Sequence, residues 1–228
     1  MRHTLLALAA ILTALGGSAG NDIRSLWTRM PDTAAVYIDS LTKRDMLYNY
    51  DNSIGFASAN FFGGNSWIDT IAGNYMSLKP SDAMEMQMRV LPKADSTQVI
   101  CVVKTYKPAD ASAADAREAI ADADAGESDV AFFDTQWQPL GGTFGLPLST
   151  DEDSLLSQLT YCPDTMTRKR YAELKAMIDP VMLIARLSAD DETLTLTLGT
   201  PMLTREERND VKTIILSRKF KWNGSTFK

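Results

Sequence analysis

The stretch Met84-Glu85-Met86-Gln87-Met88-Arg89-Val90 decides the fold, because apolar and polar residues alternate along it without interruption. This alternation is typical of a β-strand that packs one face on a core. A turn at residues 92–96 follows, and the apolar segment 98–106 then predicts an antiparallel partner strand. The methionine face of this hairpin belongs either to the core or to an adaptable binding surface.

The same layout returns in the second half of the chain, which indicates an internal repeat. Residues 181–187 and 193–198 predict a second hairpin around the turn Ala189-Asp190-Asp191. In each half a helical stretch and a last strand follow, and these last strands span 130–137 and 214–222. We therefore expect two repeats of strand, strand, helix and strand.

Helix signals occupy equivalent places in the two repeats. In the second repeat Thr204-Arg205-Glu206-Glu207 is a capping box, in which the first hydroxyl and the last carboxylate each satisfy a free backbone N–H. In the first repeat the alanine- and aspartate-rich run 109–125 lies at the same point, and Gly126 is a candidate C-cap.

Two helices are expected ahead of the first repeat. Asp22 is a candidate N-cap for a short helix that Pro31 ends. Asp32 or Thr33 is then expected to begin a second helix that runs to about Arg44.

Further elements precede each hairpin. Residues 67–78 predict an extra hairpin turned by Gly73-Asn74. Ahead of the second repeat, Thr150 is expected to cap a helix over 151–161, and Thr165 to begin another that ends at Ile178.

These elements predict an α+β protein in which helices lie on one face of an antiparallel sheet. Residues 21–140 would form the first repeat and 148–228 the second, with a joint at 141–147. We expect the two repeats to form one compact unit.

The first 20 residues have the features of a cleaved signal peptide. Arg2 and His3 give a basic start, an apolar run spans Leu5 to Leu15, and Gly17-Ser18-Ala19 supplies small residues for cleavage. A retained anchor is the alternative, although the run is shorter than the roughly 20 residues that span a bilayer. The sequence predicts a periplasmic or secreted protein with no membrane insertion after cleavage.

Composition excludes several classes of function. His3 is the only histidine, so the mature chain would lack the side chain that serine and cysteine hydrolases commonly use as a base. Nucleotide-binding glycine motifs and a GxSxG sequence are absent. A formal net charge of −6 disfavours nucleic acid as a partner. No cofactor is expected.

Cysteine and acidic residues leave three chemical questions open. Cys101 and Cys162 could form a disulfide in an oxidising compartment, or Cys101 could be a buried apolar residue. The acidic stretch 109–129 is either an exposed insertion or a weak calcium site, and we expect no metal. A hydrolase that uses paired carboxylates needs no histidine and is the alternative function.

Four segments together resemble a domain-of-unknown-function family of secreted proteins from Bacteroidetes. They are Met30-Pro31-Asp32, the Gly63-Gly64 pair before a hairpin, Val102-Val103-Lys104-Thr105, and the run from Phe132 to Leu140. The resemblance spans essentially the whole mature chain and implies secretion. It brings no established activity, substrate or catalytic residue.

The candidate binding residues are large apolar side chains near turns and on one strand face: Phe61, Phe62, Trp67, Met84, Met86 and Met88. Aromatic residues beside glycines favour interface loops, although the same pattern also leads into ordinary hairpins. We predict a non-catalytic module that binds another envelope or secreted protein, or an envelope component.

Overall fold

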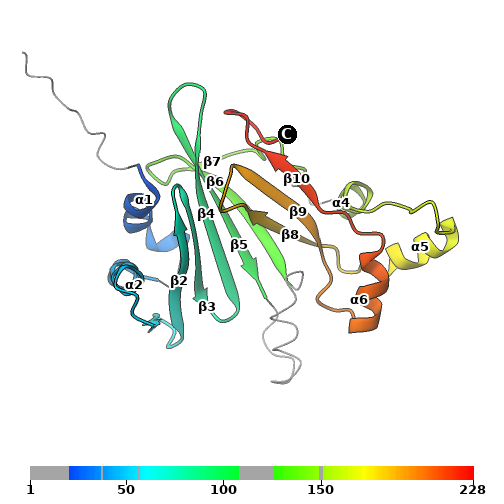
Figure 1. Ribbon diagram of the computed structural model, residues 1–228, viewed down its shortest axis with the longest axis horizontal. Helices are drawn as coiled ribbons and strands as arrows, with labels where there is room; N and C mark the ends of the chain where they lie inside the picture. The colour runs from blue at the N-terminus through cyan, green and yellow to red at the C-terminus, as the bar shows by residue number, and fades with distance from the viewer. Residues whose placement is uncertain (1–20, 37, 56, 108–125, 149–150) are drawn as a thin grey trace, which may run out of the picture.

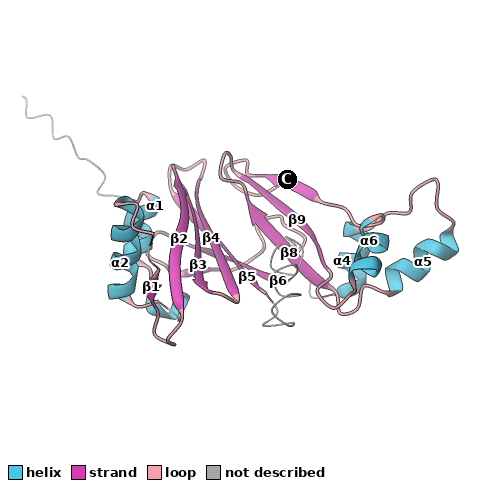
Figure 2. Ribbon diagram, turned by 60° about the horizontal axis from the view of Figure 1, so that its bottom comes forward, coloured by secondary structure: helices cyan, strands magenta, loops and turns pink. Residues whose placement is uncertain are grey.

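Two antiparallel sheets form the centre of the protein, and helices lie beyond each of them (Figure 1). The computed structural model describes residues 21–36, 38–55, 57–107, 126–148 and 151–228. Helices α1 and α2 cover the larger sheet, and α4, α5 and α6 gather at the opposite end of the molecule, beyond the smaller sheet (Figure 2). The α+β class predicted from the sequence is confirmed.

The larger sheet has seven strands that pair in the order of the chain. They are β1 (Ser58–Ala59), β2 (Asn65–Ala72), β3 (Tyr75–Ser81), β4 (Met84–Pro92), β5 (Gln98–Tyr106), β6 (Glu127–Phe133) and β7 (Pro139–Leu140). The predicted hairpin turned by Gly73-Asn74 joins β2 to β3, and Gly73 adopts a φ of 54° that glycine tolerates without strain.

The smaller sheet has three strands in the order β10-β9-β8. They are β8 (Met182–Leu187), β9 (Thr193–Gly199) and β10 (Arg218–Lys221). The trios β4-β5-β6 and β8-β9-β10 therefore share one pairing order. The helix expected within the first repeat falls on residues 109–125, which lie outside the described residues, so the internal repeat stays a prediction.

The N-terminal helices differ from the prediction at one point. Asp22 caps α1 (Ile23–Arg29) as expected, and its carboxylate accepts the N–H groups of Arg24 and Ser25 at 3.0 and 3.1 Å. The second helix does not begin at Asp32 or Thr33, where only a short 3-10 turn (Asp32–Ala34) forms.

Helix α2 (Ser40–Asp51) begins after Asp39, whose carboxylate accepts the N–H of Thr42 at 2.8 Å. The predicted start at Asp32 was wrong for a tertiary reason. The Asp32 carboxylate binds the Lys43 ammonium at 2.8 Å, so it does not cap its own backbone. Ala35 and Ile38 are also buried in the core between the two helical segments.

In the second half, helices α4 (Glu152–Leu159) and α5 (Arg168–Ala176) are shorter than predicted. Asp151 caps α4 and Thr167 caps α5, whereas Thr150 lies outside the described residues. The predicted capping box of α6 (Arg205–Lys212) is present in full, since Thr204 and Glu207 satisfy each other's backbone N–H groups.

Strand β4 separates two apolar cores. Its methionines point toward α1 and α2, together with the fully buried Trp27. The opposite face of the large sheet packs on the small sheet through residues that include Cys101, Val103, Leu187 and Leu196. The prediction of helices on one face therefore holds for the large sheet, and a second sheet covers its other face.

Polar groups on that second face of β4 hold the two sheets together. Gln87 accepts the backbone N–H of Leu187 at 2.8 Å. Arg89 donates to the carbonyl of Ser188 at 2.6 Å and is only 6% exposed. These side chains satisfy backbone groups at the end of β8, which is an edge strand of the small sheet.

Candidate functional site

The structure divides the predicted binding residues into two groups. Met84, Met86 and Met88 are 4%, 0% and 0% exposed beneath α1 and α2, so this strand face belongs to the core and offers no binding surface. Phe61 and Phe62 are 78% and 64% exposed, and Trp67 is half-buried. The three aromatic residues lie at one edge of the large sheet, in and beside the loop that joins β1 to β2.

Asn60 builds the loop that carries the two phenylalanines. Its side-chain oxygen accepts the N–H groups of Phe62 and Gly64 at 3.1 and 2.9 Å. Its amide donates to the carbonyl of Pro80 in β3 at 3.0 Å. Because Asn60 is itself 8% exposed, these bonds fix the loop to the sheet. We call residues 60–64 the aromatic loop.

The two exposed rings of the aromatic loop contact each other edge to face. Their centroids are 5.4 Å apart and their planes are 87° apart. Aromatic pairs prefer this geometry because the positive edge of one ring meets the negative face of the other. The loop therefore presents two large apolar side chains to solvent in a defined arrangement, which lowers the entropy lost when a partner binds.

A cavity of about 300 Å³ lies where the strands that flank the aromatic loop meet α2. Its lining comes from α2, from the segment that follows it, and from β1 and β2: Met46, Asn49, Tyr50, Ile54, Gly55, Ala57, Ser58, Ser66, Trp67 and Ile68. The indole N–H of Trp67 donates to Asp69 at 2.8 Å, and the Lys79 ammonium lies 5.2 Å from the centre of the ring system. Trp67 is therefore both a predicted binding residue and part of the cavity lining.

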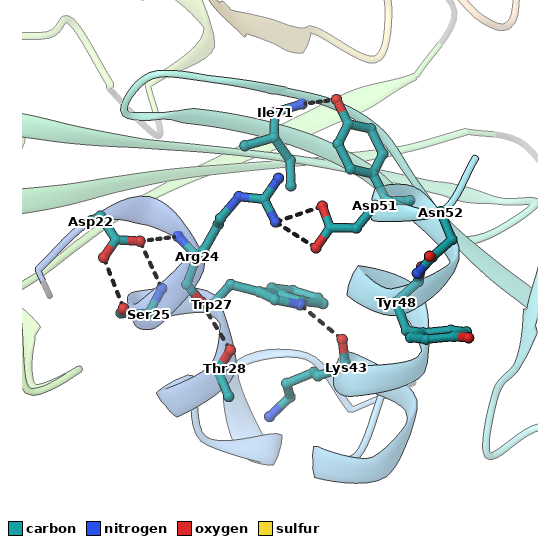
Figure 3. A network of polar contacts seen from close by, with 11 residues as sticks. Asp22, Arg24, Ser25, Trp27, Thr28, Lys43, Tyr48, Asp51, Asn52 and Ile71 are labelled. Atoms are coloured by element: carbon teal, nitrogen blue, oxygen red, sulfur yellow. Dashed lines mark hydrogen bonds and ion pairs between the residues drawn. The ribbon is translucent and has the colours of Figure 1, made fainter. Parts of the chain in front are cut away.

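Hydrogen bonds within the protein engage several polar groups of the lining. Asn49 donates to the Ser58 hydroxyl at 3.2 Å, and the Ser66 hydroxyl donates to the Pro80 carbonyl at 2.6 Å. The hydroxyl of Tyr50 accepts the backbone N–H of Ile71 at 3.0 Å, a bond drawn in Figure 3. Each of these polar groups therefore has at least one hydrogen-bond partner within the protein.

Sequence reasoning missed the lining residues of α2 and of the segment after it, although a signal was present. Residues 52–68 contain no Asp, Glu, Lys or Arg, whereas 23% of the whole chain is charged. The stretch is instead rich in asparagine, serine, glycine and aromatic residues. Binding loops of antibodies share this composition, in which aromatics anchor and small polar residues adapt.

Carboxylates with shifted pKa values cap helices and turns. Hydrogen bonds from nearby backbone and hydroxyl groups lower the pKa of Asp22, Asp39, Asp95, Asp191 and Glu207, and that of Asp95 falls to about 2. Such shifts keep a carboxylate ionised, whereas the general acid of a glycosidase needs a raised pKa. These five groups therefore do not favour the paired-carboxylate hydrolase.

Both cysteines are free thiols, so the disulfide left open by the sequence is not formed. Cys101 is fully buried between the sheets, and burial raises the pKa of its thiol far above the ordinary value. Cys162 is partly exposed in the segment after α4.

We expect iodoacetamide to modify only Cys162 in the native protein, because the species that this reagent alkylates is an accessible thiolate. Both thiols should react after denaturation in guanidinium chloride, which serves as the control. Intact-mass measurement gives the number of adducts. Rapid native modification of Cys101 would contradict the burial described above.

Within the described part of the chain, no group of three or more His, Cys, Asp or Glu residues could hold a metal ion. The acidic stretch 109–129 lies largely outside the described residues, apart from its end at and after Gly126. None of the helices that the structure describes is long and apolar enough to cross a membrane. Residues 1–20, the expected signal peptide, lie outside the described residues as well.

The fold defines an α+β protein of two packed antiparallel sheets with an aromatic loop at one edge. The family model described as "Protein of unknown function (DUF3256)" matches residues 16–227, and the chain belongs to this family. The unknown-function family expected from the sequence is thereby confirmed, while secretion stays a prediction.

A solved structure with the same fold is described as a domain of an uncharacterized protein from Porphyromonas gingivalis W83. It is 20% identical to this chain, with a TM-score of 0.58 over 90% of this chain and 96% of that one. At this identity the likeness shows the fold alone. No curated protein matches the chain.

Proposed function

We propose that this protein is a non-catalytic, secreted or periplasmic module that binds a protein or another envelope component through its aromatic loop. The observation that carries the proposal is the exposed pair Phe61 and Phe62, held on a loop that Asn60 fixes to the sheet. Clustered exposed aromatic side chains are typical of interaction sites. The signal-like residues 1–20 support export.

The charge pattern supports a protein or an uncharged envelope component over an anionic partner. The stretch 52–68 that surrounds the aromatic loop carries no charged side chain, and the whole chain has a net charge of −6. Anionic polymers and lipid headgroups need clustered lysine and arginine, which this surface does not supply.

The proposal predicts that the double variant Phe61→Ser/Phe62→Ser loses its partner without losing its fold. Tagged protein spanning residues 21–228 would be used to capture partners from the envelope fraction of the native host. We expect one stoichiometric partner with the unchanged protein and at least about tenfold less with the variant, because truncating an aromatic anchor typically costs over 1 kcal/mol. The midpoint of thermal unfolding should stay nearly constant, since both side chains are exposed.

A matched control removes exposed apolar side chains elsewhere. Tyr161 and Met202 are 46% and 71% exposed; Tyr161 follows α4 and Met202 precedes α6, and Figure 2 shows these two helices at the opposite end of the molecule from α1 and α2. The variant Tyr161→Ser/Met202→Ser should retain the partner. Equal loss with both double variants, or no loss with either, would argue against the aromatic loop as the binding site.

A further inference from the structure

We infer that three lysines at the end of the chain, Lys219, Lys221 and Lys228, form a surface that binds an acidic polysaccharide. We call these residues the lysine cluster. The inference goes beyond the proposed function, because it concerns a different surface and a different ligand. Its evidence comes from strand pairing, from the charge pattern of residues 211–228 and from the absence of exposed large apolar side chains beside the cluster.

Strand pairing places the three lysines on one face of the small sheet. Lys221 and Lys228 exchange both of their backbone hydrogen bonds, at 2.8 and 3.0 Å, so they lie directly opposite each other. Lys219 precedes Lys221 by two residues and points to the same side of β10, roughly 7 Å away along the strand. Phe220, between them, points to the other side and belongs to the core. All three lysines are exposed.

The lysine cluster lacks compensating charge. Residues 211–228 contain five Lys or Arg residues and no Asp or Glu. None of the three lysines forms an ion pair with another described residue. Like charges that lie directly opposite each other in a strand pair are destabilising. An anion that bridges Lys221 and Lys228 would therefore remove a repulsion that the free protein carries.

Asp191 lies beside the cluster and competes with such an anion. Thr193, which pairs with Lys221 across the sheet, donates its hydroxyl to the Asp191 carboxylate at 2.9 Å. Hydrogen bonds from Thr193 and Ser188, and then the charge of Lys221, lower the pKa of Asp191, so this carboxylate is ionised at neutral pH. One carboxylate beside three ammonium groups leaves the face cationic.

The acidic character of the whole chain does not cancel this local charge. The net charge is −6, but the Debye length is about 8 Å at physiological ionic strength, so more distant carboxylates are largely screened. Strand β10 is the edge strand opposite to β8, and β8 is the strand that Gln87 and Arg89 of the large sheet bind (Figure 1). The cluster therefore lies on the side of the small sheet that is remote from the large one.

The surroundings of the cluster favour a polysaccharide over other polyanions. Among the described residues, the exposed large apolar side chains all lie outside β8, β9 and the segment 203–228. Membrane surfaces and protein partners are usually held by inserted apolar or aromatic side chains in addition to charge. An acidic polysaccharide needs only cations and hydroxyl groups, and Thr193 and Thr195 pair with Lys221 and Lys219. The predicted export argues against nucleic acid.

Fluorescence anisotropy of labelled polygalacturonate oligomers, titrated with the protein spanning residues 21–228, tests the inference. We expect saturable binding in about 50 mM NaCl and roughly tenfold weaker binding in about 200 mM, as for about three charge contacts. The variant Lys221→Gln/Lys228→Gln should bind about tenfold more weakly. The variant Asp191→Asn should bind about threefold more tightly, because a competing charge is removed while the turn keeps its acceptor.

A matched control removes two positive charges elsewhere. Arg168 and Lys169 are exposed on α5, so Arg168→Gln/Lys169→Gln changes the net charge by the same amount. This variant should bind polygalacturonate as the unchanged protein does, and neutral dextran should not bind. Without polymer, the midpoint of thermal unfolding of Lys221→Gln/Lys228→Gln should stay constant or rise, because a like-charge contact is removed.

Four results would overturn the inference: no binding of polygalacturonate, equal binding of dextran, equal losses in the two double variants, or lysine-dependent sedimentation with vesicles of phosphatidylcholine and phosphatidylglycerol but no lysine-dependent binding of the polymer. The proposed function is judged separately, because Phe61→Ser/Phe62→Ser should bind polygalacturonate normally. If that variant loses the captured partner while the unchanged protein fails to bind the polymer, the proposed function stands and this inference fails.

Discussion

Replacing Trp27 with alanine is expected to lower the free energy of unfolding by about 3 to 5 kcal/mol, because a buried aromatic is lost and a cavity remains. Trp27 is 0% exposed and packs between α2 and the methionine face of the large sheet. Its indole N–H also donates to the Lys43 carbonyl at 3.3 Å, as Figure 3 shows. Urea denaturation of the mature chain would measure the loss.

The control for Trp27→Ala is Tyr48→Ala on α2. Tyr48 is 61% exposed, so its truncation should change the free energy of unfolding by only about 0.5 kcal/mol. A comparable loss in both variants would mean that the core beneath α1 and α2 is not packed as described. A lower denaturant slope for Trp27→Ala alone would instead indicate that the native or denatured state had changed in compactness.

Replacing Arg89 with alanine should cost about 3 kcal/mol, because it removes a buried charged donor from the contact between the sheets. The Arg89 guanidinium donates to the Ser188 carbonyl at 2.6 Å. Its Nη2 lies 3.9 Å from a Glu192 carboxylate oxygen, and its buried Nε has no acceptor among the described residues. The alanine variant leaves the Ser188 carbonyl without this donor and opens space beside β8.

Glu192→Gln separates the two contacts of Arg89. The ion pair is long and the Glu192 side chain is 41% exposed, so solvent screening should hold the loss below about 1 kcal/mol. Chemical denaturation of both variants gives the comparison. If Glu192→Gln cost as much as Arg89→Ala, the ion pair rather than the Ser188 bond would hold the sheets together.

Local sequence signals predicted the elements that local interactions create. The Asp22 cap, the Gly73-Asn74 hairpin and the Thr204 to Glu207 capping box each depend on residues within a few positions of one another, and all three are present. The alternation in 84–90 likewise predicted β4 and its buried methionine face. These signals are reliable because a capping hydrogen bond, a tight turn and the two-residue period of a strand each depend on residues that are close together in the chain.

The wrong predictions concern side chains that bind residues far away in the sequence. Asp32 has the sequence context of a helix cap, but Lys43 takes its carboxylate. Gln87 and Arg89 have the alternation of a solvent face, but the small sheet covers them and uses them to satisfy its own backbone. Neither outcome is visible from spacing alone, because each depends on which element packs opposite.

The candidate site likewise contains residues that the sequence indicated and residues that only the structure revealed. The sequence indicated Phe61, Phe62 and Trp67, since aromatics beside glycines mark a loop in any fold. It could not distinguish them from the buried methionines, and it missed the cavity residues Tyr50 and Ile54. Exposure and cavities depend on how separate elements pack, so these features required the folded structure.

By itself the sequence determined the α+β class, the main hairpins and helix caps, and the absence of a histidine outside the first few residues, because these depend on composition and on neighbours along the chain. Only the tertiary structure decided that a second sheet would cover β4, that the methionines would be core, and that a cavity would form between α2 and β2. Burial and edge pairing result from contacts between segments far apart in the chain, and no local period encodes which segments will meet.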